Sequence, residues 1–106
     1  MPKYMIQGSY TSEGVKGVRS KGGSSRREAI SEMLEGLGGS LECMYFSFGD
    51  ADVLVIADLP DNEAATAIAL TVNAAGGATT KTWPLITPEE VDAAAQRSVS
   101  YTAPGG

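Results

Sequence analysis

The chain has 106 residues, a formal net charge of −5 and no histidine. This length suits one domain that buries about two thirds of the surface of the unfolded chain. The absence of histidine excludes Ser-His-Asp and Cys-His catalysis, imidazole-ligated haem and most zinc or non-haem iron sites, and the acidic balance argues against a general affinity for nucleic acid.

The first predicted element is a strand over residues 3–11. Its faces alternate, with Tyr4, Ile6, Gly8 and Tyr10 on one and Met5, Gln7 and Ser9 on the other. Residues 12–23 follow, where Gly14 and Gly17 weaken any helix. We expect only one or two helical turns in a basic loop there.

A helix is predicted over residues 24–37. Ser25 and Glu28 have the spacing of a capping box, and Gly38-Gly39 provides a left-handed stop. One stripe of this helix is apolar and should pack on a sheet: Ala29, Ile30, Met33, Leu34 and Leu37.

A central β-hairpin is predicted from two apolar runs, residues 41–48 and 53–59, separated by Gly49-Asp50-Ala51-Asp52. The second run is apolar on both faces, which indicates an interior strand. The first run also has two apolar faces, with Leu41, Cys43 and Tyr45 on one and Met44, Phe46 and Phe48 on the other.

The last third of the chain predicts a helix, a strand and a short helix. Asp61 caps a helix over residues 62–75, in which Ile68, Leu70 and Val72 should provide most of the burial. A strand over residues 78–86 contains Pro84, which is typical of an edge. Thr87-Pro88-Glu89-Glu90 opens a helix to about Arg97, and residues 98–106 form an arm that needs another surface to become ordered.

This β-α-β-β-α-β order predicts an α+β, ferredoxin-like domain over residues 1–106. Its four-stranded antiparallel sheet has the first and third strands in the middle and both helices on one face. The other face remains apolar, so a second copy of the chain should cover it in a homodimer or larger oligomer. Some residues expected there are polar enough to line a wet pocket: Gln7, Ser9, Thr79, Thr80 and Thr82.

The basic segment Lys21 to Arg27 is the first candidate site. Its glycines, a helix N-terminus and the side chains of Lys21, Ser25, Arg26 and Arg27 could hold a phosphate or carboxylate. The alternative is a flexible loop before an ordinary cap, with both arginines solvated or paired to acidic residues.

Two further candidates involve aromatic and acidic side chains. Tyr4, Tyr10, Tyr45, Lys81 and Trp83 could line a pocket in which Tyr and Lys act as acid and base, although such residues are commonly core or edge residues. Asp50 and Asp52, with Asp58 and Asp61, could bind Mg²⁺ or Ca²⁺, although Asp in turns more commonly accepts local hydrogen bonds. We expect no metal and no cofactor.

The chain resembles the GYD-domain family along nearly its whole length. The motifs are M-P-K-Y-M-I-Q-G-S-Y-T-S-E-G, G-G-S-S-R-R-E-A, F-G-D-A-D-V, D-L-P-D-N and L-I-T-P-E-E-V-D-A-A-A. The resemblance implies a small bacterial protein of the dimeric α/β-barrel, ferredoxin-like group and no established activity. Ala51-Asp52 stands where family members typically carry a Tyr-Asp pair, so a role of that aromatic is not implied here.

The expected function is binding of a small anionic or aromatic molecule by a cytoplasmic oligomer. The alternatives are a cofactor-independent enzyme of the monooxygenase or isomerase kind and a structural or regulatory oligomer without ligand. The lone Cys43 and the absence of a signal peptide or membrane span favour the cytoplasm. We expect no nucleic-acid and no membrane partner.

Overall fold

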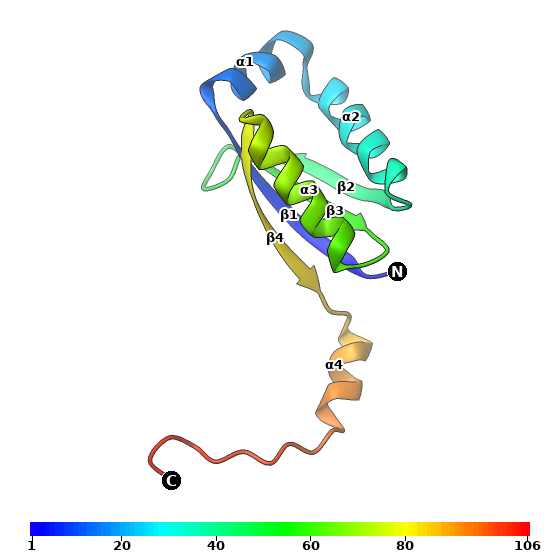
Figure 1. Ribbon diagram of the computed structural model, residues 1–106, viewed down its shortest axis with the longest axis vertical. Helices are drawn as coiled ribbons and strands as arrows, with labels where there is room; N and C mark the ends of the chain where they lie inside the picture. The colour runs from blue at the N-terminus through cyan, green and yellow to red at the C-terminus, as the bar shows by residue number, and fades with distance from the viewer.

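Four strands and four helices make up the computed structural model, which describes residues 1–106 (Figure 1). In chain order they are β1 (Lys3–Tyr10), α1 (Ser12–Lys21), α2 (Gly23–Gly36), β2 (Ser40–Phe46), β3 (Val53–Asp58), α3 (Asn62–Ala75), β4 (Ala78–Leu85) and α4 (Pro88–Ala95). None of the helices combines the length and the apolar character that crossing a membrane requires.

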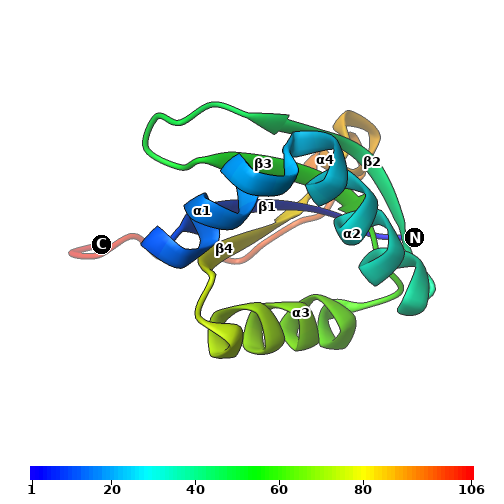
Figure 2. The same cartoon turned by 90° about the horizontal axis from the view of Figure 1, so that it is seen from above.

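The sheet has the strand order β2-β3-β1-β4, and every neighbouring pair is antiparallel. This is the order of the ferredoxin-like fold, with β1 and β3 in the middle as the sequence predicts. Helix α1 runs directly into α2, and α3 lies beside β4 (Figure 2).

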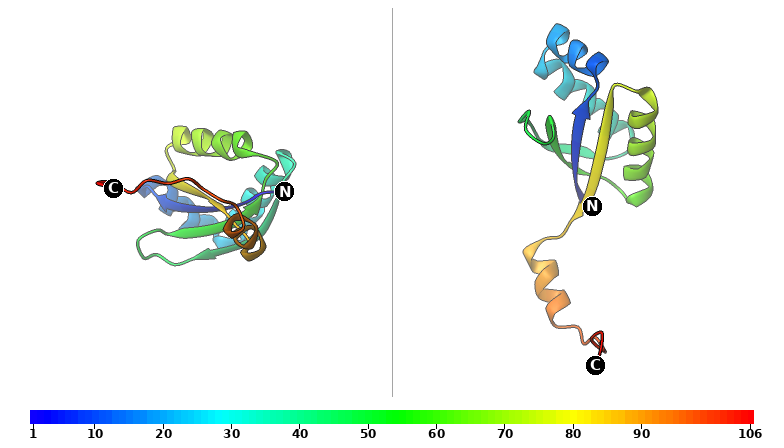
Figure 3. Two further views of the ribbon diagram at one scale, coloured as in Figure 1. Left: turned by 90° about the horizontal axis from the view of Figure 1, so that it is seen from below. Right: turned by 90° about the vertical axis from the view of Figure 1, so that its left-hand side faces the viewer.

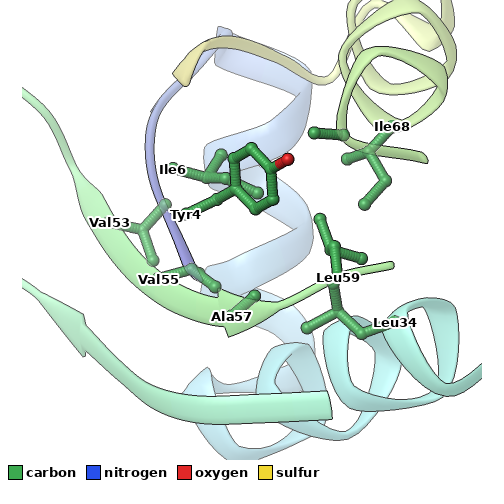
Figure 4. Close-up of a cluster of buried hydrophobic side chains, with 9 residues drawn as sticks. Tyr4, Ile6, Leu34, Val53, Val55, Ala57, Leu59 and Ile68 are labelled. Atoms are coloured by element: carbon green, nitrogen blue, oxygen red, sulfur yellow. The ribbon is translucent and has the colours of Figure 1, made fainter. Parts of the chain in front are cut away.

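The core lies on the face of the sheet that α2 and α3 cover. Tyr4 from β1, Leu34 from α2 and Ile68 from α3 point into one cluster (Figure 4). Its other buried members are Ile6, Val53, Val55, Ala57, Leu59 and Ala65. The predicted alternation of β1 is therefore confirmed, and the structure adds that Tyr4, Ile6 and Gly8 are on the buried side of the strand.

Strand β2 contains an irregularity that the alternating pattern does not reveal. The register with β3 shifts between Leu41 and Cys43. As a result Leu41 packs against the core together with Met44 and Phe46, while Cys43 does not. The prediction that Leu41 shares a face with Cys43 and Tyr45 was wrong, because a bulge reverses the side-chain alternation that follows it.

Helix α1 is ten residues long, where the sequence predicts only one or two turns. The Thr11 side chain caps it by accepting a hydrogen bond from Gly14 N. Thr11 also donates from its N and its Oγ1 to Gly77 O, at 3.0 and 3.2 Å. These contacts to the turn between α3 and β4 stabilise a helix that its glycines alone would not support.

The start of α2 also differs from the prediction. The helix begins at Gly23, and its N-cap Gly22 has a φ of 87° and no side-chain cap. Ser25 therefore lies inside the helix, and the predicted capping box of Ser25 and Glu28 was wrong. Glycine at position 22 permits the left-handed turn that joins α1 to α2 without a loop, so α2 begins earlier than Ser25.

Helix α3 has the predicted bounds, and Asp61 caps it by accepting from Ala64 N at 2.9 Å. Its burial comes from Ala65 and Ile68, with Val72 partly buried against the same cluster. The prediction for Leu70 was wrong, since its side chain is 69% exposed. Leu70 lies two residues from Ile68, about 200° around the helix, on the side away from the sheet.

The chain after β4 leaves the body of the molecule, as Figures 1 and 3 show. Helix α4 has the predicted capping box of Thr87 and Glu90, with Pro88 in its first turn. Every residue from Ile86 to Gly106 is exposed. The molecule consequently extends over 56 Å in one direction, against 33 and 23 Å in the other two.

Candidate functional site

Two adjoining hollows lie between the helices and the sheet. The inner hollow is about 230 Å³ and the outer one about 420 Å³. Tyr10, Arg26, Val72 and Ala78 line both. We treat the two as one site, called here the helix-side cavity.

The inner hollow has an apolar lining that comes from five elements. Besides the four shared residues it contains Ile6 and Gly8 from β1, Ala29, Ile30 and Met33 from α2, Val53 and Val55 from β3, Ile68 from α3 and Thr80 from β4. Such a lining with few polar groups is typical of sites for small organic molecules.

The space exists because the residues that face the helices are small around the middle of this face. Along β1 the residues on this face are Tyr4, Ile6, Gly8 and Tyr10, so Gly8 leaves a gap between two larger side chains. In the register of β1 with β4, Gly8 lies opposite Thr80 and Tyr10 opposite Ala78. A Cβ at Gly8 would lie 2.9 Å from Val53 Cγ1, so this position is closed to larger residues.

Helix α1 forms one side of the outer hollow. It contributes Gly14, Gly17, Val18 and Lys21, and α3 with the following turn contributes Thr71, Ala75 and Gly77. The approach of α1 to this turn is close, because a Cβ at Gly14 would lie 2.0 Å from Gly77 O. Glycine at position 14 is therefore required for α1 to border the cavity.

Arg26 lies where the two hollows meet, and its guanidinium lacks a protein partner. Its Nε is buried and makes no hydrogen bond, and Arg26 forms no ion pair. Buried polar atoms in proteins nearly always have a partner, so an exception indicates an absent one. The chain has 13 acidic residues, yet none lines either hollow.

The structure brings together three of the predicted site residues: Tyr10, Lys21 and Arg26. Arg27 lies instead with Tyr45 at a separate hollow beside β2, which Gly23 and Ser24 also line. Ser25 is half-buried in α2 and lines none of these hollows.

Lys81 and Trp83 lie on β4, on the face of the sheet opposite the helices. Lys81 pairs with Gln7 and Trp83 with Met5, and both partners alternate with the inward residues of β1. Tyr45 lies on β2 at the far edge, three strand spacings or about 14 Å away. The structure thus separates Tyr45 and Lys81 from Tyr10. The prediction that Thr80 and Thr82 lie on the face away from the helices was wrong: they lie on the helix side, because they pair with Gly8 and Ile6.

Three of the four acidic candidates, Asp52, Asp58 and Asp61, make structural contacts. Asp52 Oδ2 accepts from Tyr10 N at 2.8 Å, and Asp61 caps α3. Asp58 Oδ1 accepts from Lys3 Nζ at 2.9 Å, and Lys3 also pairs with Glu42 Oε1 at 2.6 Å. Glu42, and then Asp58, raises the pKa of Lys3 above its ordinary value of 10.5.

The open sheet face, meaning the face away from α2 and α3, carries an apolar row. The register places Cys43, Ile56, Met5 and Trp83 side by side across the four strands. The first three are half-buried and Trp83 is 40% exposed. No helix of this chain covers this row.

Sequence reasoning missed the apolar part of the helix-side cavity. Ile30, Met33 and Ile68 were assigned to the core, and the alternation of β1 assigned Ile6 and Gly8 to a face without indicating space beside them. The available signal was the small size of Gly8, Ala29 and Ala78, which line the hollow from three different elements.

Comparison with known families agrees with this architecture. The model of the GYD domain family matches residues 4–95. The chain belongs to the GYD domain family. No curated protein and no solved structure matches it.

The matched part of this GYD domain contains the whole helix-side cavity. It begins in β1 and ends with the last residue of α4, so every cavity-lining residue lies within it. The residues after Ala95 lie outside the match. The family description names a domain and no activity, so function has to be argued from the site.

Proposed function

We propose that this GYD-domain protein binds a small anionic or aromatic molecule in the helix-side cavity. The observation that carries the proposal is the unpartnered, buried Nε of Arg26 at the edge of an apolar hollow. A ligand with an acceptor group would supply the missing hydrogen bond, and an apolar portion would fill the space beside it.

Binding is favoured over catalysis by the groups that the cavity lacks. A cofactor-independent oxygenase or isomerase needs a positioned base, and the lining contains no carboxylate and the chain no histidine. Tyr10 and Lys21 are the titratable groups beside Arg26. Turnover of quinol-like substrates would support the enzymatic alternative.

Native mass spectrometry of the protein as purified tests the proposal. We expect a retained small molecule, seen as mass above that of the chain or its oligomer. The variant Ala78→Phe places a bulky side chain where the two hollows meet and should lose this mass. A purified protein without extra mass, which also takes up none of the organic acids and alcohols offered to it, would contradict the proposal.

We further propose that the open sheet face packs against a second copy of the chain. The supporting observation is the row formed by Cys43, Ile56, Met5 and Trp83, which crosses the whole sheet. Two such faces related by a two-fold axis would exclude water from both.

The free thiol of Cys43 suits a reducing compartment, so we propose a cytoplasmic location.

The segment of residues 86–106, which contains α4 and the arm of residues 98–106, belongs to the same proposal. An isolated helix shorter than about 12–15 residues is marginal in water, and α4 has eight residues with none buried. Its Val91 and the tail residues Val99 and Tyr101 are exposed apolar side chains. Contact with the second copy would bury them and stabilise α4.

A further inference from the structure

We infer that the ligand of the helix-side cavity is an amphipathic carboxylate, an organic acid with one aromatic ring or a short branched chain. Its acid group pairs with Arg26 and its apolar body occupies the inner hollow. The inference rests on the proposed function. It adds the chemical class of the ligand and the orientation of the ligand in the cavity.

The inner hollow fits an apolar body because its free polar groups are few, chiefly the Tyr10 hydroxyl and the Arg26 guanidinium. Ten of its 13 lining residues are hydrophobic, and the others are Gly8, Arg26 and Thr80. The Thr80 hydroxyl accepts from Asn73 Nδ2 at 3.0 Å, and Thr80 N donates to Asn73 Oδ1. A sugar or nucleoside placed there would leave its hydroxyl groups without partners, which is costly.

The acid group follows from the electrostatics of the cavity. The guanidinium is always charged and can donate to both oxygens of a carboxylate at once, from Nε and one terminal nitrogen. Arg26 has no acidic neighbour to neutralise it, and Lys21 adds a second positive charge at the outer hollow. Both charges favour an anion in a protein that is acidic overall.

A carboxylate fits better than a phosphate because few donors converge on the site. A phosphate monoester carries a charge of about −1.5 to −2 and three acceptor oxygens, which proteins commonly satisfy with several backbone N–H groups. The uncapped N-terminus of α2 could supply these, but its residues Gly23 and Ser24 line the separate hollow beside β2. The guanidinium of Arg26, with its buried Nε, and the hydroxyl of Tyr10 are then the donors at the inner hollow.

The size of the inner hollow limits the ligand further. Its volume of about 230 Å³ lies below the range of about 300–1,000 Å³ that is typical of sites for drug-sized ligands. The buried body is therefore about one ring or a short branched chain. Any longer substituent would extend past Arg26 into the outer hollow beneath α1.

Isothermal titration calorimetry on the full chain tests the inference with a matched series of probes. Hydrocinnamate combines the acid with an apolar ring, hydrocinnamyl alcohol keeps the ring without the charge, and acetate and inorganic phosphate supply an anion without the ring. We expect hydrocinnamate to bind about tenfold or more tightly than the alcohol, as the loss of a charge-assisted hydrogen bond predicts, and acetate and phosphate to bind more weakly still.

Two variants of adjacent arginines provide the control. Arg26→Gln should weaken hydrocinnamate by about tenfold or more and leave the alcohol unchanged, since it removes a charged donor from the cavity. Arg27→Gln removes the same charge from the same helix outside the cavity and should leave both affinities unchanged. Thermal unfolding of each variant reports whether the fold is intact.

The outcomes separate this inference from the proposed function. Equal binding of the acid and the alcohol, or an acid affinity that Arg26→Gln does not alter, would contradict the inference that the ligand is a carboxylate. Either result would still support the cavity as a binding site. If phosphate binds as tightly as hydrocinnamate and this binding depends on Arg26, the inference that the ligand has an apolar part in the inner hollow is contradicted. If no probe binds and the purified protein retains no molecule, the proposed function itself fails.

Discussion

Glycine at position 14 determines how closely α1 approaches the rest of the fold. A Cβ there would meet the Gly77 carbonyl oxygen at 2.0 Å, a backbone atom that cannot rotate away. The hydrogen bonds from Thr11 to Gly77 fix the same junction. One residue without a side chain thus permits the contact that brings α1 to the outer hollow.

Substituting this residue is the first prediction. Gly14→Ala should lower the free energy of unfolding by about 1–3 kcal/mol, the usual cost of inserting atoms into a packed site. Gly17→Ala, in the same helix with nothing within 4 Å of the added Cβ, should be neutral or stabilising by up to about 1 kcal/mol. Urea denaturation of both variants measures the difference, and equal stabilities would show that α1 does not pack against the turn in solution.

A second prediction concerns Lys3, which joins β1 to β2 and β3 through Glu42 and Asp58. These carboxylates raise the pKa of Lys3, so its ion pairs stabilise the fold fully below pH 10.5 and lose their effect as the pH rises through the elevated pKa. Thermal unfolding of the wild type and Lys3→Met should differ by a constant amount from neutral pH up to about pH 10 and converge above it. A difference that persists at high pH would assign the effect of Lys3 to packing of its aliphatic chain.

Among the helices, the sequence predicted the starting residue correctly where a single side chain caps the helix. Asp61 and Thr87 cap α3 and α4 as expected. The length of α1 was missed because contacts of its cap Thr11 with Gly77 support it, and its direct join to α2 was missed because it depends on Gly22. Gly77 is more than fifty residues away in the sequence, so no local pattern reveals it.

A third prediction concerns the C-terminal arm. Deleting residues 99–106 removes only exposed residues, so the fold of each chain should stay intact. Contact of the arm with a second copy predicts that the deletion weakens dimerisation, as sedimentation velocity at decreasing concentration would show. Hydrogen exchange adds an independent measurement, since protection of the α4 amides should rise with protein concentration. An unchanged oligomer mass and stability after the deletion would contradict the contact.

For the molecule as a whole, the open sheet face carries the proposed contact between two copies of the chain. Ile56→Asp places a charge in the middle of the apolar row and should convert the proposed dimer to a monomer, because an unpaired charge in an interface is costly. Leu70→Asp makes the same change on the outer side of α3 and should leave the dimer intact. Light scattering during size-exclusion chromatography measures both masses, and a monomeric wild type would refute the interface.

The sequence alone determined the order of the four strands and of helices α2, α3 and α4, the interior position of β1 and β3 and the membership of the GYD domain family. These depend on periodicity, turn residues and motifs, which act over a few neighbouring residues. The reversal of Leu41 by a bulge, the length of α1 and the exposure of Leu70 required the folded chain.

Only the tertiary structure determined which residues form the site. Tyr10, Lys21 and Arg26 come together, while Arg27, one residue further on, faces another hollow. The missing partner of Arg26 and the space beside it are properties of segments far apart in the chain, since Val72 and Ala78 complete the cavity. A sequence records which residues are present, but the space between distant residues exists only once the helices have packed on the sheet.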